Sequence, residues 1–207
     1  KDKEIFKKAR EMGFTQIAAF ILQKGVVLMA IAHYEGNLAV SFSLTLNILM
    51  VMSTIGTAYQ IAKMPLINKL MNQKKYNQVK IEIKKSYLFS IVFYLASYCL
   101  ITNYGDYIFD AIGKENKLLD SGLLHMLLGV VFLEMLHSIA VGFIAASNQF
   151  PFYKAGIITA IIVLTGGVYI SLKYEMWVFI AFIGIAQLSY NNWKWPYYLW
   201  KEYDWKN

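Results

Sequence analysis

The chain has 207 residues, of which 57% are hydrophobic and 16% charged, and its mean hydropathy is +0.43. A soluble domain of this length does not need so much apolar surface, and long apolar runs follow one another along the whole chain, so the composition predicts an all-α integral membrane protein. The net charge of +7 does not indicate a nucleic-acid-binding protein, because the lysines gather between the apolar runs, and the single cysteine excludes a framework of internal disulfides.

Six apolar runs reach, or nearly reach, the roughly 17–25 residues that a helix needs to cross a ~30 Å hydrocarbon layer. Helices are expected because a helix satisfies its own backbone hydrogen bonds inside a membrane. The predicted spans, in chain order, are residues 14–32, 38–59, 86–102, 119–148, 152–172 and 177–193. The sequence therefore predicts a six-transmembrane-helix bundle.

The lysines predict how the bundle is oriented, because Lys and Arg favour cytoplasmic loops. If the N-terminus is cytoplasmic, the lysine-rich stretches 1–10, 63–85 and 194–206 all lie inside. The stretches that then lie outside hold Lys114, Lys117 and Lys173. We therefore expect both termini to be cytoplasmic.

Residues 194–207 follow the last span and interleave aromatic residues with lysines. Trp and Tyr favour the headgroup level of a membrane, and Pro196 can open a short helix there. We expect an interfacial tail, with a docking site for a partner as the alternative.

Lys24 and Glu134 are predicted to lie deep in the hydrocarbon layer. Lys24 is about ten residues into the first span, or ~15 Å, and Glu134 is about 12 residues from the outer end of the fourth, or ~18 Å. An ionisable group at that depth costs at least ~2.5–3.5 kcal/mol unless it is paired or hydrated. Opposite charges at similar depth predict either an ion pair or a shared aqueous cavity.

Other polar side chains accompany these two charges. His137 and Ser138 follow Glu134 at i+3 and i+4, so the three share one helical face. The remaining spans contribute Gln60 and four candidate substrate-cavity residues, which are Gln23, Asn47, Gln187 and Asn191.

Three interpretations of Glu134 and His137 compete. They can form a hydrogen-bonded pair that holds helices together, or a proton or cation site that lines a transport cavity. A metal site is disfavoured, because a di-iron bundle needs a second Glu-x-x-His motif and further carboxylates, which the sequence lacks. The first two interpretations remain open.

Enzyme signatures are missing from the sequence. It has no Gly-rich phosphate loop, no serine nucleophile elbow and no His-Glu-x-x-His motif. A membrane-embedded glycosyltransferase or polymerase would gather catalytic residues in one large loop, and no loop here is large enough. We expect that the chain is not an enzyme and needs no cofactor or metal.

Two stretches carry a resemblance to a known family. "FLEMLHSIAVGFIAASNQFPFYKAGIIT" (132–159) and "IAQLSYNNWKWP" (185–196) resemble the C-terminal half of Wzx-type oligosaccharide flippases, which are polysaccharide biosynthesis transporters. These belong to the MOP superfamily, together with the MATE drug exporters. The Pro-containing extension "AKMPLINKLMNQKKYNQVKIEIKKSY" (62–87) is also similar to members of this superfamily.

The resemblance implies a fold and an activity. Family members have two six-helix halves around a substrate cavity, so the chain is expected to be the second half of a longer transporter in a bacterial inner membrane, with the N-terminal half as its partner. The implied activity moves a polyprenyl-diphosphate-linked oligosaccharide to the outer leaflet by alternating access, for O-antigen or other cell-surface polysaccharide biosynthesis.

The charged residues suggest roles within that activity. Lys24 would attract the diphosphate, with Gln23, Asn47, Gln187 and Asn191 lining the cavity, and Glu134, His137 and Ser138 would couple transport to H⁺ or Na⁺. The rival hypotheses are a MATE-like exporter of drugs or metabolites and a membrane assembly subunit that transports nothing. A hydrated groove would favour transport, and a dry, saturated network would favour the subunit.

Overall fold

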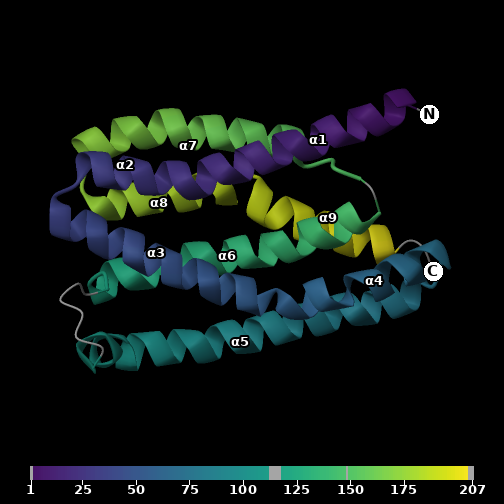
Figure 1. Ribbon diagram of the computed structural model, residues 1–207, viewed down its shortest axis with the longest axis horizontal. Helices are drawn as coiled ribbons and strands as arrows, with labels where there is room; N and C mark the ends of the chain where they lie inside the picture. The colour runs from purple at the N-terminus through teal and green to yellow at the C-terminus, as the bar shows by residue number, and fades with distance from the viewer. Residues whose placement is uncertain (1, 112–117, 148, 205–207) are drawn as a thin grey trace.

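The computed structural model describes residues 2–111, 118–147 and 149–204, and these form helices with no strand among them (Figure 1). The predicted all-α class is therefore confirmed. Two predictions concern residues that the structure does not describe. They are the placement of Lys114 and Lys117 on the outer side of the membrane, and the end of the interfacial tail at residues 205–207. The elements are α1 (Asp2–Phe20), the π-helical turn η1 (Ile21–Gly25), α2 (Val26–His33), α3 (Gly36–Gly56), α4 (Ala58–Asn72), α5 (Tyr76–Ala111), α6 (Ser121–Ala146), α7 (Tyr153–Lys173), α8 (Met176–Leu188) and α9 (Asn191–Asp204).

Five helical segments are long and apolar enough to cross a membrane within the described ranges, so the chain is a multi-pass membrane protein. Two of them join several elements, since α1, η1 and α2 form one continuous rod and α3 continues into α4. The other three are α5, α6 and α7. The helices run along the long axis of the molecule, and the start of α1 and the end of α9 both lie at its right-hand end in Figure 1. We call this the basic end, because it also holds the lysine-rich α4–α5 turn.

The sixth span differs from the single helix predicted for residues 177–193. Helix α8 has 13 residues and α9 has 14, so each is only about 20 Å long, and the chain breaks between them at Ser189 and Tyr190. Ser189 Oγ donates to the main-chain oxygen of Ala186 at 2.8 Å, a bond that competes with continued helix. The two short helices follow one another along the bundle (Figure 1). The expected count of six full-length spanning helices is therefore not confirmed.

Helix α6 lies at the centre of the bundle and contacts α3, α4, α5, α8 and α9. One apolar core surrounds its first half and includes Phe42, Leu49 and Phe179. A second core lies toward the basic end and includes Trp195 and Leu199 of α9, both nearly fully buried. One face of the expected interfacial tail thus packs into the bundle.

The α4–α5 turn has a geometry that usually requires glycine. Lys74 adopts a φ of 56°, its N–H donates to the Met71 oxygen at 3.0 Å, and the Lys75 N–H donates to the Leu70 oxygen at 2.9 Å. These paired bonds form a Schellman motif, in which the left-handed residue ends a helix. The turn places Lys74 and Lys75 at the tip of an α4–α5 hairpin at the basic end.

Candidate functional site

A cavity of about 460 Å³ lies between the α1–η1–α2 rod, α3, α6 and the α8–α9 break. Its lining includes all eight residues that the sequence assigned to a transport site. They are Gln23, Lys24, Asn47, Glu134, His137, Ser138, Gln187 and Asn191. Apolar side chains such as Leu22, Val27 and Val131 fill the spaces between them.

Lys24 stands on the π-helical turn η1, which interrupts the first rod after the 19 residues of α1 and before the 8 residues of α2. Such turns occur often at functional sites, because the extra residue in the turn changes the direction in which side chains point. Lys24 and Gln23 are exposed, and no carboxylate lies within 4.0 Å of the Lys24 ammonium group in the part of the chain that the structure describes. A cation that enters the cavity without a partner is available to an anionic ligand.

Glu134 lies in the middle of α6 and is half-buried. Neither a hydrogen-bond partner nor an ion pair is found for its carboxylate among the described residues. Lys24 and Glu134 therefore share the cavity without forming a direct pair. Of the two arrangements that the sequence allowed, the structure has the shared cavity.

His137 is held by the first residue of α9. Its Nδ1 lies 3.0 Å from the main-chain oxygen of Asn191. A carbonyl oxygen only accepts, so this contact requires the proton on Nδ1 and leaves the lone pair of a neutral ring on Nε2. His137 can then bind a proton at Nε2 without losing its bond to α9.

The side-chain amide of Asn191 forms hydrogen bonds to two other side chains. Its Nδ2 donates to Thr159 Oγ1 at 2.8 Å, and its Oδ1 accepts from Trp195 Nε1 at 3.2 Å. This network joins α7, α9 and, through His137, α6. Asn191 thus borders the cavity while its side chain stabilises the α8–α9 break.

The next residue, Asn192, differs from Asn191 in the hydrogen bonding of its side chain. Both polar atoms of its side chain are buried, and neither has a hydrogen-bond partner in the described part of the chain. An unsatisfied buried amide is costly. The break therefore carries one asparagine whose side-chain nitrogen and oxygen are both hydrogen-bonded and one whose side-chain atoms have no partner among the described residues.

Sequence reasoning missed two polar residues that line the cavity, Thr15 and Gln16. Gln16 precedes Gln23 by seven residues, and i and i+7 positions lie on the same face of a helix. That spacing was a usable signal. Gln60, by contrast, is structural, because its Nε2 donates to the main-chain oxygen of Ile139 at 2.8 Å beside Gly142.

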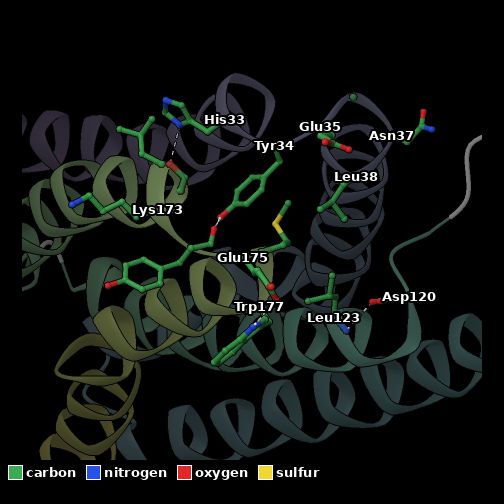
Figure 2. Close-up of a pocket in the computed structure, with 15 residues that line it drawn as sticks. His33, Tyr34, Glu35, Asn37, Leu38, Asp120, Leu123, Lys173, Glu175 and Trp177 are labelled. Atoms are coloured by element: carbon green, nitrogen blue, oxygen red, sulfur yellow. Dashed lines mark hydrogen bonds between the residues drawn. The ribbon is translucent and has the colours of Figure 1, made fainter.

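A second, larger cavity of about 980 Å³ (Figure 2) is lined by residues of the α2–α3 and α7–α8 turns, which lie at the end opposite the basic end (Figure 1). Its lining includes the carboxylates of Glu35, Asp120 and Glu175. The Tyr34 hydroxyl donates to the main-chain oxygen of Tyr174 at 3.2 Å, and burial raises the pKa of Tyr34 to about 12, so this donor stays protonated. None of the predicted site residues lies here.

No cluster of three or more His, Cys, Asp or Glu side chains able to hold a metal ion occurs in residues 2–111, 118–147 and 149–204. Comparison with protein-family models, with curated proteins and with solved structures finds no match.

Proposed function

We propose that the chain is one half of a membrane exporter that moves a polyprenyl-diphosphate-linked oligosaccharide to the outer leaflet by alternating access. The observation that carries the proposal is the cavity, which the Lys24 ammonium group and the Glu134 carboxylate both border while neither has an ion-pair partner among the described residues. A membrane protein retains such groups in its interior chiefly where substrates or ions bind. The resemblance of residues 132–159 and 185–196 to oligosaccharide flippases supplies the class of substrate.

The exposure of the polar side chains at the cavity favours transport over a purely structural role. Gln23, Lys24, Asn47 and Ser138 are exposed at the cavity, whereas a subunit held together by these groups would bury and pair them. Part of the lining does form a hydrogen-bonded network, through His137 and Asn191. That network lies at the helix break and leaves the four exposed groups accessible.

Lys24 favours an anionic substrate. An exporter of drug-like cations would place its substrate against carboxylates, and a lysine in the same cavity would repel that substrate. A diphosphate instead gains charge-assisted hydrogen bonds from an ammonium group. The proposal therefore assigns Lys24 to the diphosphate, and the polar Gln23, Asn47 and Gln187 to the remainder of the headgroup.

Glu134, His137 and Ser138 are proposed to couple transport to an ion. The three side chains border the cavity from consecutive turns of α6. The Glu134 carboxylate and the Nε2 of His137 can each accept a proton, and the Ser138 hydroxyl can supply an oxygen ligand to Na⁺. Ion binding here would change the charge that faces Lys24.

The exposed side of the cavity indicates where the other half of the transporter would lie. Lys24 and Asn47 come from the two rods that flank the cavity, and both are open to the outside of the bundle. At mid-membrane depth these groups need either water or a partner surface, because hydrocarbon would leave them unsolvated. A second half that faces this opening would complete the cavity.

Transport by the complete transporter tests this function. Proteoliposomes would hold a fluorescent polyprenyl-diphosphate oligosaccharide, and its flipping would be followed with and without a proton or Na⁺ gradient. We expect Glu134→Gln to abolish the gradient dependence, whereas Glu175→Gln, at the far cavity, keeps it. Undiminished, gradient-dependent flipping by Glu134→Gln would contradict the coupling role, and export of small cations alone would contradict the proposed substrate.

A further inference from the structure

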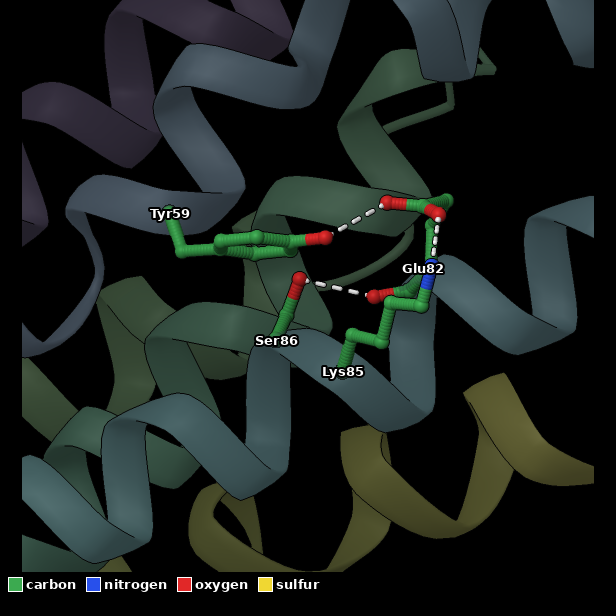
Figure 3. A network of polar contacts seen from close by, with 4 residues as sticks. All are labelled: Tyr59, Glu82, Lys85 and Ser86. Carbon is green, nitrogen blue, oxygen red and sulfur yellow. Dashed lines mark hydrogen bonds and ion pairs between the residues drawn. The ribbon is translucent and has the colours of Figure 1, made fainter.

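Away from the cavity, a cluster of four side chains joins α4 to α5 at the basic end (Figure 3). The Tyr59 hydroxyl donates to Glu82 Oε2 at 3.0 Å, and Lys85 Nζ lies 3.1 Å from Glu82 Oε1. The Ser86 hydroxyl donates to the main-chain oxygen of Glu82 at 2.9 Å. The Glu82 side chain is only 11% exposed, so its carboxylate is fully engaged between the two helices.

Lys63 extends this cluster along α4. Its Nζ lies 5.9 Å from the centre of the Tyr59 ring, and no carboxylate pairs with it in the described residues. Lys63, Glu82 and Lys85 together leave one net positive charge. The ammonium groups of Lys63 and Lys85 keep N–H donors that these contacts do not use.

The cluster lies at the level of a membrane boundary. Between Lys85 and the exposed Tyr104, α5 rises about 29 Å, close to the ~30 Å thickness of a hydrocarbon layer. The α3–α4 rod rises about 32 Å from Leu38 to Tyr59. Since both rods cross once, Tyr59, Lys63 and Lys85 meet at the headgroup level, where Tyr and Lys are favoured.

Acidic residues do not compete for an anion here. Residues 58–86 hold seven lysines and a single acidic residue, which is Glu82. Exposed apolar side chains flank the lysines, including Ile61 at 61% and Leu88 at 65%. A basic surface bordered by exposed apolar side chains fits the boundary between headgroups and acyl chains.

We infer that Lys63 and Lys85 form a binding site for the phosphodiester of an anionic phospholipid at the basic end, with Tyr59 and Glu82 positioning the two ammonium groups. Glu82 bonds both to Lys85 and to the Tyr59 hydroxyl of α4, and the Lys63 ammonium group lies 5.9 Å from the centre of the same Tyr59 ring. The site is independent of the transport cavity and does not require the proposed transport function. Its ligand is a bilayer lipid, because the exposed apolar side chains would contact the acyl chains.

The tip of the hairpin provides a matched control. Lys74 and Lys75 carry the same charges but lie about 14 Å farther along the helices, beyond the ~8–10 Å over which salt screens charges. If lipid binds at a specific headgroup site, the binding depends on Lys63 and Lys85 at the membrane boundary. If the chain is only attracted to negatively charged membranes in general, the binding depends equally on Lys74 and Lys75 at the tip of the hairpin.

The test measures thermal unfolding of the chain in phosphatidylcholine nanodiscs that contain increasing phosphatidylglycerol. We expect phosphatidylglycerol to raise the wild-type midpoint. The double variant that combines Lys63→Gln with Lys85→Gln should need about ten- to thirtyfold more phosphatidylglycerol to reach half of the wild-type rise in the midpoint. The reason is that each lysine near a membrane surface increases the affinity for anionic lipid about fivefold. Lys74→Gln with Lys75→Gln should behave like the wild type.

Two further measurements keep the result decisive. The Lys63 ammonium group makes no hydrogen bond to any residue that the structure describes, so a reduced response of Lys63→Gln alone would show loss of the lipid contact even if the double variant folds poorly. Inorganic phosphate in pure phosphatidylcholine nanodiscs should leave the midpoint unchanged. A wild-type response from Lys63→Gln and the double variant, an equal loss from the tip variant, or stabilisation by inorganic phosphate would each overturn the lipid site.

Discussion

The imidazole Nδ1 of His137 lies 3.0 Å from the main-chain oxygen of Asn191, so the centre of α6 is bonded to the first residue of α9. This contact joins the predicted ion-coupling face to the break in the sixth span. A change at the cavity can therefore reach the helix junction through a single hydrogen bond.

Replacing His137 should loosen that junction. We expect His137→Ala to lower the free energy of unfolding by about 0.5–1.5 kcal/mol for the lost hydrogen bond, with a further loss from packing. His125→Ala is the control, because His125 is exposed and its ring packs against the Tyr98 ring, with ring centres 5.7 Å apart. Thermal unfolding in detergent compares them, and equal midpoints would contradict a structural role for the His137 bond.

The close approach of Gln60 to α6 depends on Gly142. A Cβ at Gly142 would collide with the Gln60 amide, so Gly142→Ala should destabilise the fold by about 1–3 kcal/mol. Gly129 lies on the same helix with no atom within 4 Å of its Cβ position, so Gly129→Ala should be neutral or stabilise by about 0.5–1 kcal/mol. Unfolding midpoints that move together in both variants would show that Gln60 does not pack as described.

The two asparagines at the helix break should respond in opposite directions. Asn192→Leu replaces a buried amide that has no partner, so we expect unchanged or increased stability. Asn191→Leu removes the bonds to Thr159 and Trp195 and should cost about 1–3 kcal/mol. Thermal unfolding of the two variants decides this, and a larger loss for Asn192→Leu would mean that its amide has a ligand in the membrane.

The sequence predicted the all-α membrane class, because long apolar runs are a direct consequence of the thickness of a bilayer, and each of the five long apolar helical segments overlaps one predicted span. It also selected residues that share a cavity. Depth was the useful signal, since Lys24 and Glu134 lie on different helices and only their distance from the membrane surface relates them.

The sixth span could not be read from apolar content. Residues 177–186 are strongly apolar, but Gln187, Ser189, Asn191 and Asn192 follow. The break arises where the Ser189 hydroxyl donates to the main-chain oxygen of Ala186 and the Asn191 side chain bonds to Thr159 of α7 and Trp195 of α9. The bond between Asn191 and Thr159 is a tertiary contact between residues 32 positions apart, which local composition does not encode. The same holds for Gln60, which resembles a cavity residue in sequence but bonds to a carbonyl of α6.

The central claim is that Lys24 presents a free cation to an anionic substrate, and substrate binding measures it most directly. The chain in nanodiscs would be titrated with polyprenyl diphosphate carrying an oligosaccharide, with the uncharged polyprenol as the reference. Lys24→Gln should weaken binding of the diphosphate by about ten- to a hundredfold, the loss expected for a charge-assisted hydrogen bond, and leave the polyprenol unaffected. The control Lys154→Gln, outside the cavity, should bind like the wild type. Wild-type affinity of Lys24→Gln for the diphosphate would contradict the account.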